Sequence, residues 1–187
     1  MIKIGITGSL SSGKSSAAKI MCKKKYPLFN ADKTVSELYK KKTIIDKIKK
    51  KFGFKSNNLK KELRKILVNN KNNLKKLEYI IHPLVRKEMK YFYKKNKSRK
   101  IVISEIPLLI ESKLQNFFDV TIFIKASKSN RLKRFLKKGG NKKIFLYLEK
   151  CQLRQSKKEK FCDYIVVNNK PFSILKKNIN NIIEKYE

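Results

Sequence analysis

The chain has 187 residues, 41% of them hydrophobic, and a formal net charge of +35 at pH 7. This length suits one compact α/β core with a small insertion and excludes several large domains. The longest apolar stretch, residues 101–110, contains Ser104, Glu105 and Pro107 and is shorter than the ~20 residues that span a bilayer, so we expect no membrane segment. Nothing after Met1 resembles a secretory signal, and we therefore expect a cytoplasmic protein.

The high positive charge alone would suit a protein that binds nucleic acid through phosphate groups. Arginine, however, accounts for only six of the 49 basic residues, and the lysines are spread along the whole chain among many asparagines and isoleucines. Lysine, asparagine and isoleucine have A/T-rich codons, whereas surfaces that read bases favour the planar guanidinium of arginine. We attribute the charge to codon bias and expect no dedicated nucleic-acid partner.

The sharpest motif lies near the amino terminus, where the spacing of glycines, lysine and serine fits G-x-x-x-x-G-K-[ST]. Residues 2–6 read as an apolar strand before it, and residues 16–21 as the opening of a helix after it. Glycines let successive amide groups turn toward a polyphosphate, the lysine would reach its β- and γ-phosphates, and the serine hydroxyl would ligate Mg²⁺. A glycine-rich turn without a ligand is the alternative. The residues expected to bind the nucleotide are Gly8, Ser11, Ser12, Gly13, Lys14, Ser15 and Ser16.

A carboxylate follows the second predicted strand. Residues 27–30 read as that strand and residues 31–38 as a helix. Ligands of open α/β sheets bind at the carboxyl ends of the strands, so Asn30 and Asp32 would face the nucleotide. Asp32 is a candidate catalytic base, but an aspartate also favours the start of a helix as a cap. Position alone leaves both roles open.

Residues 40–97 have a helical pattern that no strand interrupts, which predicts an all-helical insertion between the second and third strands. Gly53 and asparagine pairs at 57–58, 69–70 and 72–73 are expected to separate the helices. We expect the His82–Pro83 pair to fall between two helices, with the proline at the start of the second. Taken alone, His82 suits capping or packing better than catalysis.

Three further strands are predicted, at residues 101–103, 119–124 and 163–167, followed by a closing amphipathic helix. The strands are apolar enough for a parallel sheet that is covered on both faces. The fold class is therefore α/β, a P-loop three-layer fold with a five-stranded parallel sheet. Glu105, after the third strand, would hold Mg²⁺ through water, or else cap the following turn.

A basic segment separates the last two strands. Arg131 and Arg134 lie on a predicted helix, residues 137–140 contain two lysines and two glycines, and a second basic helix is expected to reach Arg154. Such a glycine-hinged, cation-rich segment suits a lid that closes over phosphates and excludes water. A solvated helix pair is the alternative.

Together these pieces resemble one family, the dephospho-coenzyme A kinases of the nucleoside-monophosphate-kinase-like group. The resemblance extends over nearly the whole chain, and the His-Pro and Pro-Leu-Leu-x-Glu elements in this order are more specific than the glycine loop. The matching residues are 6–8, 13–15, 30–32, 77–78, 82–85, 107–109, Glu111, Arg134, Gln152, Asp163 and Asn168.

The resemblance implies transfer of the γ-phosphoryl group of ATP to the ribose 3′-hydroxyl of dephospho-coenzyme A, the last step of coenzyme A biosynthesis. It implies ATP and Mg²⁺ as cofactors, with Ser15 and Glu105 as metal ligands, and a helical insertion that binds the acceptor. A kinase for a nucleoside or nucleoside monophosphate is the alternative, and a basic nucleic-acid-binding P-loop protein a more distant one. We expect a monomer or a weak homo-oligomer.

Specific roles follow from the same resemblance. One domain would comprise a core (about 1–31, 99–127 and 160–187), an insertion (about 32–98) and a lid (about 128–159). The implied catalytic residues are Lys14, Asp32 and Arg134, with Asp32 acting on the acceptor hydroxyl, and Asn168 would contact the nucleotide. The acceptor would contact Asp32, Lys60, His82, Arg86, Pro107, Leu108 and Lys138.

The chain departs from the family's pattern at several of these positions. Asn30 stands where the family usually has aspartate, and Glu105 where it often has aspartate. Lys60 and Lys138 stand where the family has arginines. Because lysine lacks the bidentate fork of arginine, acceptor binding or lid closure is expected to be weaker here.

Overall fold

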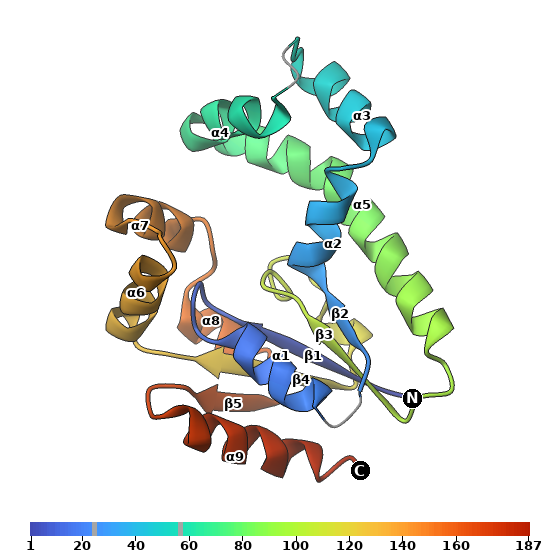
Figure 1. Cartoon of the computed structure of the whole chain (residues 1–187), viewed down its shortest axis with the longest axis vertical. Helices are drawn as coiled ribbons and strands as arrows, with labels where there is room; N and C mark the ends of the chain where they lie inside the picture. Colours follow the sequence, from blue (N-terminus) through green and yellow to red (C-terminus); the bar gives the residue numbers. More distant parts are fainter. Residues whose placement is uncertain (24–25, 56–57) are drawn as a thin grey trace. The chain divides into compact units, whose positions relative to one another are not determined.

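The computed structural model describes residues 1–23, 26–55 and 58–187, without the side chains of residues 60, 64, 68, 69 and 71. The described chain forms two compact units. We call residues 1–30 and 96–187 the sheet unit and residues 31–95 the helical unit. Figure 1 shows the helical unit in blue to green, between the second and third strands along the chain.

The described residues of the sheet unit form a five-stranded sheet in the order β2-β3-β1-β4-β5, with every neighbouring pair parallel. The register places Ile6 and Asn30 beside Glu105, and Gly8 beside Ile124. The carboxyl ends of β1, β2, β3 and β4 therefore lie along the same side of the sheet. The prediction of a five-stranded parallel sheet is confirmed. The strands are β1 (Ile2–Gly8), β2 (Leu28–Asn30), β3 (Ile101–Glu105), β4 (Val120–Lys125) and β5 (Tyr164–Val167).

Helices cover the sheet because its strands carry apolar side chains toward both faces. On one face, α1 (Lys14–Cys22) and α9 (Phe172–Ile183) pack side by side, and Met21 and Ile179 are fully buried. Figure 1 shows these two helices next to each other. The predicted first and closing helices are confirmed. The short helix α8 (Gln155–Glu159) contacts β4, and the 3₁₀ turn η1 (Gln115–Phe117) precedes that strand.

Two basic helices follow β4, namely α6 (Lys128–Lys137) and α7 (Lys142–Lys150). The prediction that the second basic helix continues to Arg154 is wrong. The chain leaves the helix after Lys150 because the backbone N–H of Leu153 donates to Glu111 Oε1 at 3.1 Å instead of to a helical carbonyl. A new helix, α8, then starts at Gln155.

The helical unit contains α2 (Ala31–Leu38), α3 (Lys42–Phe52), α4 (Leu59–Asn69) and α5 (Lys71–Lys95). These helices share a hydrophobic cluster in which Ile48 is fully buried. The predicted all-helical insertion is confirmed. Gly53 ends α3 with a left-handed φ of 70°, as its predicted place between helices requires. The other buried members of the cluster are Ile44, Leu59, Leu63, Leu77, Ile80 and Ile81.

The predicted break at His82–Pro83 is wrong, because α5 runs through it. Proline lacks the N–H that would bond to the carbonyl of Tyr79, one turn earlier. Tyr79 is 84% exposed, so water can reach that turn, while Ile80 and Ile81 hold the opposite side of the helix in the core. Burial of the apolar face therefore outweighs the one missing hydrogen bond.

The asparagine pairs behave differently from one another. Asn70 lies at the junction of α4 and α5, as predicted, and its Oδ1 accepts from Asn72 N at 2.9 Å. The predicted turn at 72–73 is wrong, because both residues belong to the first turn of α5. At 57–58, the first residue lies outside the described residues, and Asn58 caps α4 by accepting from Lys61 N at 3.1 Å.

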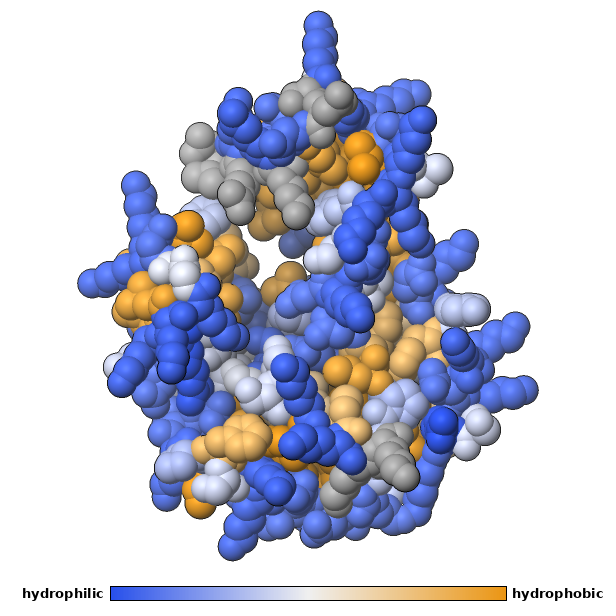
Figure 2. Space-filling model, viewed as in Figure 1, coloured by the Kyte–Doolittle hydropathy of each residue, from blue (hydrophilic) through white to orange (hydrophobic). Residues whose placement is uncertain are grey.

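Hydrophilic side chains cover much of the face seen in Figure 2, over both units, and do not gather in one stripe. This spread agrees with the distribution of lysine along the sequence. None of the helices in the described ranges is both long and apolar enough to pass through a bilayer.

Candidate functional site

The glycine loop between β1 and α1 has a backbone that only small residues permit. Gly8 has a φ of 153°, and a Cβ built on it would lie 2.5 Å from the carbonyl oxygen of Ile124 in β4. Gly13 has a φ of 105°, and its Cβ would lie 2.2 Å from Nδ2 of Asn168. Ser11 also adopts a left-handed φ, 57°. The loop is therefore wound tightly, as phosphate-binding loops must be.

Lys14 is almost buried in this loop, with 8% of its surface exposed. Its Nζ donates to the carbonyl oxygens of Gly8 at 3.1 Å and Ser9 at 2.9 Å. The lysine is also the first residue of α1, so the positive end of the helix dipole lies at the glycine loop. A helix start and a lysine together favour an anion at this place. Ser16 follows in the same turn and is half-buried.

Ser12 is fully buried, and its Oγ has no hydrogen-bond partner among the described residues. A buried hydroxyl without a partner is costly, and a ligand that accepts a hydrogen bond would remove that cost. The loop thus offers a donor in addition to its amides and Lys14. The nucleotide contact of Ser12 stays a prediction.

Replacing Gly13 with alanine is expected to destabilise the protein by about 1–3 kcal/mol and to weaken nucleotide binding, because the Cβ meets Asn168 and the φ is unfavourable. Gly53→Ala is a matched control, since Gly53 has a φ of 70° but nothing within 4 Å of its Cβ position. Urea unfolding and ATP titration of both variants would measure the difference. Equal effects of the two substitutions would contradict the role given to the Gly13–Asn168 contact.

Glu105 ends β3 beside the loop and is 3% exposed. Its Oε1 accepts from Ser15 Oγ at 2.6 Å, and its Oε2 accepts from Asn30 Nδ2 at 2.6 Å. Both carboxylate oxygens are thus held by side chains, which is not the arrangement of a turn cap. Hydroxyl and carboxylate oxygens are the ligands that Mg²⁺ prefers, so Ser15 and Glu105 fit the predicted metal site.

Arg134 and Asn168 both donate hydrogen bonds to the glycine loop. Arg134 donates from Nη1 to Ser12 O at 3.2 Å and from Nη2 to Asn168 O at 2.8 Å. Asn168 Nδ2 also donates to Ser12 O, at 2.8 Å. The structure therefore brings both predicted residues to the glycine loop. Lys138, the other cation predicted for the lid, is exposed just after α6.

The remaining predicted residues are distributed over both units. Asp32 is exposed in the first turn of α2, at the beginning of the helical unit. His82 and Arg86 lie one turn apart in α5, half-buried and exposed respectively. Lys60 lies in α4, and its side chain is outside the described part of the structure. Pro107 and Leu108 follow β3 in the sheet unit and are half-buried.

Burial lowers the pKa of His82 from 6.5, and Arg86 adds to this effect while Glu78 opposes it. The folded protein therefore favours the neutral ring, and the resulting stability is present above pH 6.5 and lost as the pH falls through the lowered pKa. We expect His82→Gln to reduce the loss of stability between pH 7.5 and pH 5.5 relative to the unchanged chain. Urea unfolding at both pH values would measure this, and an identical loss in the variant would contradict it.

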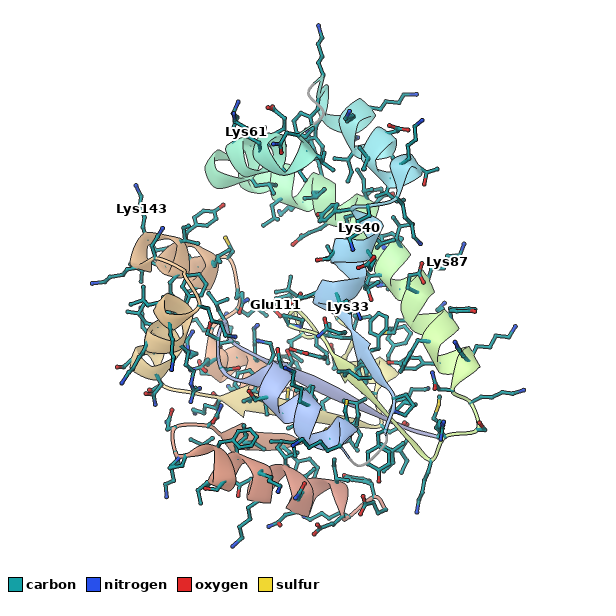
Figure 3. All side chains as sticks on the ribbon, viewed as in Figure 1. Lys33, Lys40, Lys61, Lys87, Glu111 and Lys143 are labelled. Atoms are coloured by element: carbon teal, nitrogen blue, oxygen red, sulfur yellow. The ribbon has the colours of Figure 1, made fainter. Side chains whose placement is uncertain are left out.

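Sequence reasoning missed a buried ion pair. Lys158 is fully buried, and its Nζ lies 2.6 Å from Oε1 of Glu111, labelled in Figure 3. The same Nζ donates to Pro107 O at 3.4 Å, and Thr7 Oγ1 donates to that carbonyl at 3.1 Å. This network joins β1, the turn after β3 and helix α8. Lys158 carries no distinguishing signal in the sequence, because it belongs to a run of charged residues that reads as solvated.

A comparison with known sequences identifies the family. The sequence profile described as dephospho-CoA kinase matches residues 2–173, nearly the whole chain. This chain belongs to the dephospho-CoA kinase family. A dephospho-CoA kinase of Bartonella quintana is 35% identical over 189 residues, covering 97% of this chain and 96% of that protein. Another, of Rickettsia typhi, is 32% identical and covers 100% of this chain and 98% of its own length.

Solved structures agree with the fold of this dephospho-CoA kinase family member. A Thermus thermophilus protein superposes with a TM-score of 0.85 at 23% identity, covering 98% of this chain and 97% of its own. A dephospho-CoA kinase from Campylobacter jejuni gives 0.67 at 24% identity, covering 99% and 97%. Shikimate kinase from Acinetobacter baumannii shares the P-loop kinase fold. It superposes with a TM-score of 0.56 at 12% identity, covering 99% of this chain and 92% of its own.

Proposed function

We propose that this chain catalyses transfer of the γ-phosphoryl group of ATP to the ribose 3′-hydroxyl of dephospho-CoA, giving CoA and ADP. The observation that carries the proposal is the loop in which Lys14 and the start of α1 converge beside the Ser15–Glu105 pair, in a chain that matches the family over residues 2–173. We infer that the enzyme works in the cytoplasm, as a monomer or a weak homo-oligomer.

We assign the phosphates of ATP, the phosphoryl donor, to the glycine loop. The amides of residues 8–16 would line the triphosphate, and the Lys14 ammonium would exchange its contacts with the Gly8 and Ser9 carbonyls for phosphate oxygens. Exchange of neutral carbonyls for an anion strengthens the hydrogen bonds, because both partners then carry charge. Asn168, which donates to Ser12 O, is assigned a contact with the nucleotide.

Ser15 and Glu105 are assigned a magnesium ion. Their oxygens lie 2.6 Å apart, and Asn30 orients the second carboxylate oxygen. When bound, the ion neutralises charge on the phosphates. Ser15 would contribute its hydroxyl directly, whereas Glu105 would act through ordered water.

The acceptor is assigned to the helical unit and Asp32. The carboxylate of Asp32 would accept the proton of the 3′-hydroxyl as that oxygen forms its bond to the phosphorus. Lys60, His82 and Arg86 of the same unit, with Pro107, Leu108 and Lys138, would contact the acceptor. Arg134 would stabilise the charge on the moving phosphoryl group, because it is already tied to the loop at Ser12 O.

The proposal is tested by measuring ADP formation with and without dephospho-CoA in the presence of magnesium. We expect ADP formation to depend on dephospho-CoA and to be slow with nucleosides or nucleoside monophosphates. Faster phosphorylation of a nucleoside monophosphate, with dephospho-CoA ignored, would replace this proposal with the alternative kinase. Salt-sensitive binding to nucleic acid without ATP consumption would exclude both.

A further inference from the structure

The turn after β3 leaves two residues open to a ligand. Pro107 and Leu108 are half-buried, whereas the residues on either side of them are buried, with 5% and 0% of their surfaces exposed. The turn belongs to the sheet unit and directly follows Glu105, the last residue of β3. An acceptor that contacts this turn would therefore meet Pro107 and Leu108, and their position depends on what holds the backbone of the turn.

One backbone oxygen, that of Pro107, joins this turn to two other elements. Thr7 Oγ1, near the end of β1, donates to it at 3.1 Å, and Lys158 Nζ, on α8, donates to it at 3.4 Å. Thr7 is fully buried and directly precedes Gly8, the first glycine of the loop. The loop that we assign to ATP and the turn that we assign to the acceptor are therefore linked through the Pro107 carbonyl.

The ammonium group of Lys158 has one acceptor for each of its three protons. Its Nζ lies 2.6 Å from Glu111 Oε1 and donates to the Pro107 carbonyl and to Gln152 Oε1, both at 3.4 Å. Glu111 Oε1 also accepts from the backbone N–H of Leu153 at 3.1 Å. Three donors with three acceptors fix the direction of the lysine side chain. Lys158 thus ties the turn after β3 to the segment between α7 and α8.

Stability alone does not account for this ion pair. Moving two charges out of water is costly, and neutral residues in their place often give equal or greater stability. Lys158 is fully buried and the Glu111 side chain is 17% exposed, so water offsets little of that cost. A buried pair can instead fix one arrangement of the chain among several. Here, the arrangement that it fixes is that of the Pro107 carbonyl.

We propose that Lys158 is a positioning residue for the acceptor. Paired with Glu111, it holds the Pro107 carbonyl so that the side chains of Pro107 and Leu108 lie where they contact dephospho-CoA, and it does not touch the substrate itself. This inference rests on the proposed function, because that function assigns the acceptor to this turn. Neither Lys158 nor Glu111 is among the site residues that the sequence predicts.

The double variant Lys158→Met with Glu111→Gln tests this role without leaving a charge buried and unpaired. The glutamine keeps an oxygen for the Leu153 amide, whereas the Pro107 carbonyl loses its donor from α8. We expect the free energy of unfolding to stay close to that of the unchanged chain and the KM for dephospho-CoA to rise by about tenfold. The Kd for ATP should change by less than about twofold. Lys158→Met alone should be less stable, since it leaves Glu111 unpaired.

Lys125→Met with Glu159→Gln is the control variant. Lys125 Nζ lies 2.9 Å from Glu159 Oε2, and this pair also ties α8 to the sheet, at the end of β4. The control variant should leave the KM for dephospho-CoA within about twofold of the unchanged chain. Equal rises in this KM in the two variants, or an unchanged KM in the double variant of Lys158 and Glu111, would overturn the proposal, because the ion pair would then serve packing only.

Thr7→Val tests the same carbonyl from β1 and leaves both charges in place. Valine has nearly the shape of threonine and suits a strand, but it cannot donate to Pro107 O. Loss of one neutral hydrogen bond should raise the KM for dephospho-CoA by about three- to tenfold. Should the double variant fail to fold, Thr7→Val decides alone, and an unchanged KM would refute positioning through this carbonyl.

Amide hydrogen exchange separates this inference from the proposed function. The N–H of Ser112 donates to the carbonyl of Leu108 at 2.9 Å, so this amide reports on the turn without any substrate. It should exchange about tenfold faster in the double variant than in the control variant. Faster exchange in a protein that ignores dephospho-CoA would refute the proposed function and leave the positioning of the turn standing. Equal exchange with normal use of dephospho-CoA would refute the positioning alone.

Discussion

Asp32→Asn is expected to lower the turnover of dephospho-CoA by about 10²- to 10⁴-fold, the usual contribution of a general base. Asparagine has nearly the same shape but cannot accept the proton of the ribose hydroxyl. ATP affinity should stay within about twofold of the unchanged chain, since the donor is assigned to the glycine loop. Steady-state kinetics and a separate ATP titration would measure the two effects.

Asp46→Asn is the control for this substitution. Asp46 is also an exposed aspartate of the helical unit, on α3, so its replacement by asparagine removes the same charge. It should leave turnover unchanged. If Asp32→Asn were as active as Asp46→Asn, Asp32 would be a helix cap and the reaction would need another base.

Lys14→Ala is expected to weaken ATP binding and to lower turnover by about 10²- to 10³-fold, the cost of removing one preorganised donor from a transition state. The ammonium of Lys14 would contact the phosphates both before and during transfer, so ATP affinity and turnover should fall together. Binding of ATP by calorimetry and single-turnover kinetics would separate the two contributions.

Lys19→Ala controls for charge and helix content, because Lys19 is an exposed residue of the same helix, α1. Removal of the Lys19 side chain should change neither ATP affinity nor turnover by more than about twofold, as for screened surface charges. Full ATP affinity in Lys14→Ala would contradict the assignment of the phosphates to the glycine loop.

Local features of the fold were predictable from the sequence. The glycine loop is contiguous, so its spacing alone places the two glycines, Lys14 and Ser15, and the strand and helix beside it follow from short apolar patterns. The failure at Pro83 has the opposite cause. A local helix breaker was overruled by burial of Ile80 and Ile81 in a cluster that forms only when several helices pack together.

Contacts between distant residues could not be predicted. Arg131 and Glu149 are separated by 18 positions and meet only because α6 and α7 pack against each other through Phe135 and Phe145, with ring centres 5.6 Å apart. In the sequence, Arg131 reads as one cation of the predicted lid, and nothing distinguishes Glu149 from the charged residues around it. The contact between the two residues was therefore not predictable from the sequence.

Two departures from the family's pattern turn out to contact one another. The resemblance noted in the sequence implies aspartate at the positions of Asn30 and Glu105, and here Asn30 Nδ2 donates to Glu105 Oε2 at 2.6 Å. The two positions are 75 residues apart in the sequence. An amide next to a carboxylate avoids the repulsion that two carboxylates would have. Asn30 therefore suits a carboxylate neighbour, and the other oxygen of Glu105 accepts from Ser15.

The position of the new phosphate on the acceptor tests the central claim most directly. ³¹P NMR of dephospho-CoA incubated with the protein, ATP and magnesium should show loss of the ATP γ-phosphate and growth of one phosphomonoester signal, coupled to the ribose 3′ proton. A phosphomonoester elsewhere on the acceptor, or ATP hydrolysis to inorganic phosphate with dephospho-CoA unchanged, would contradict the account.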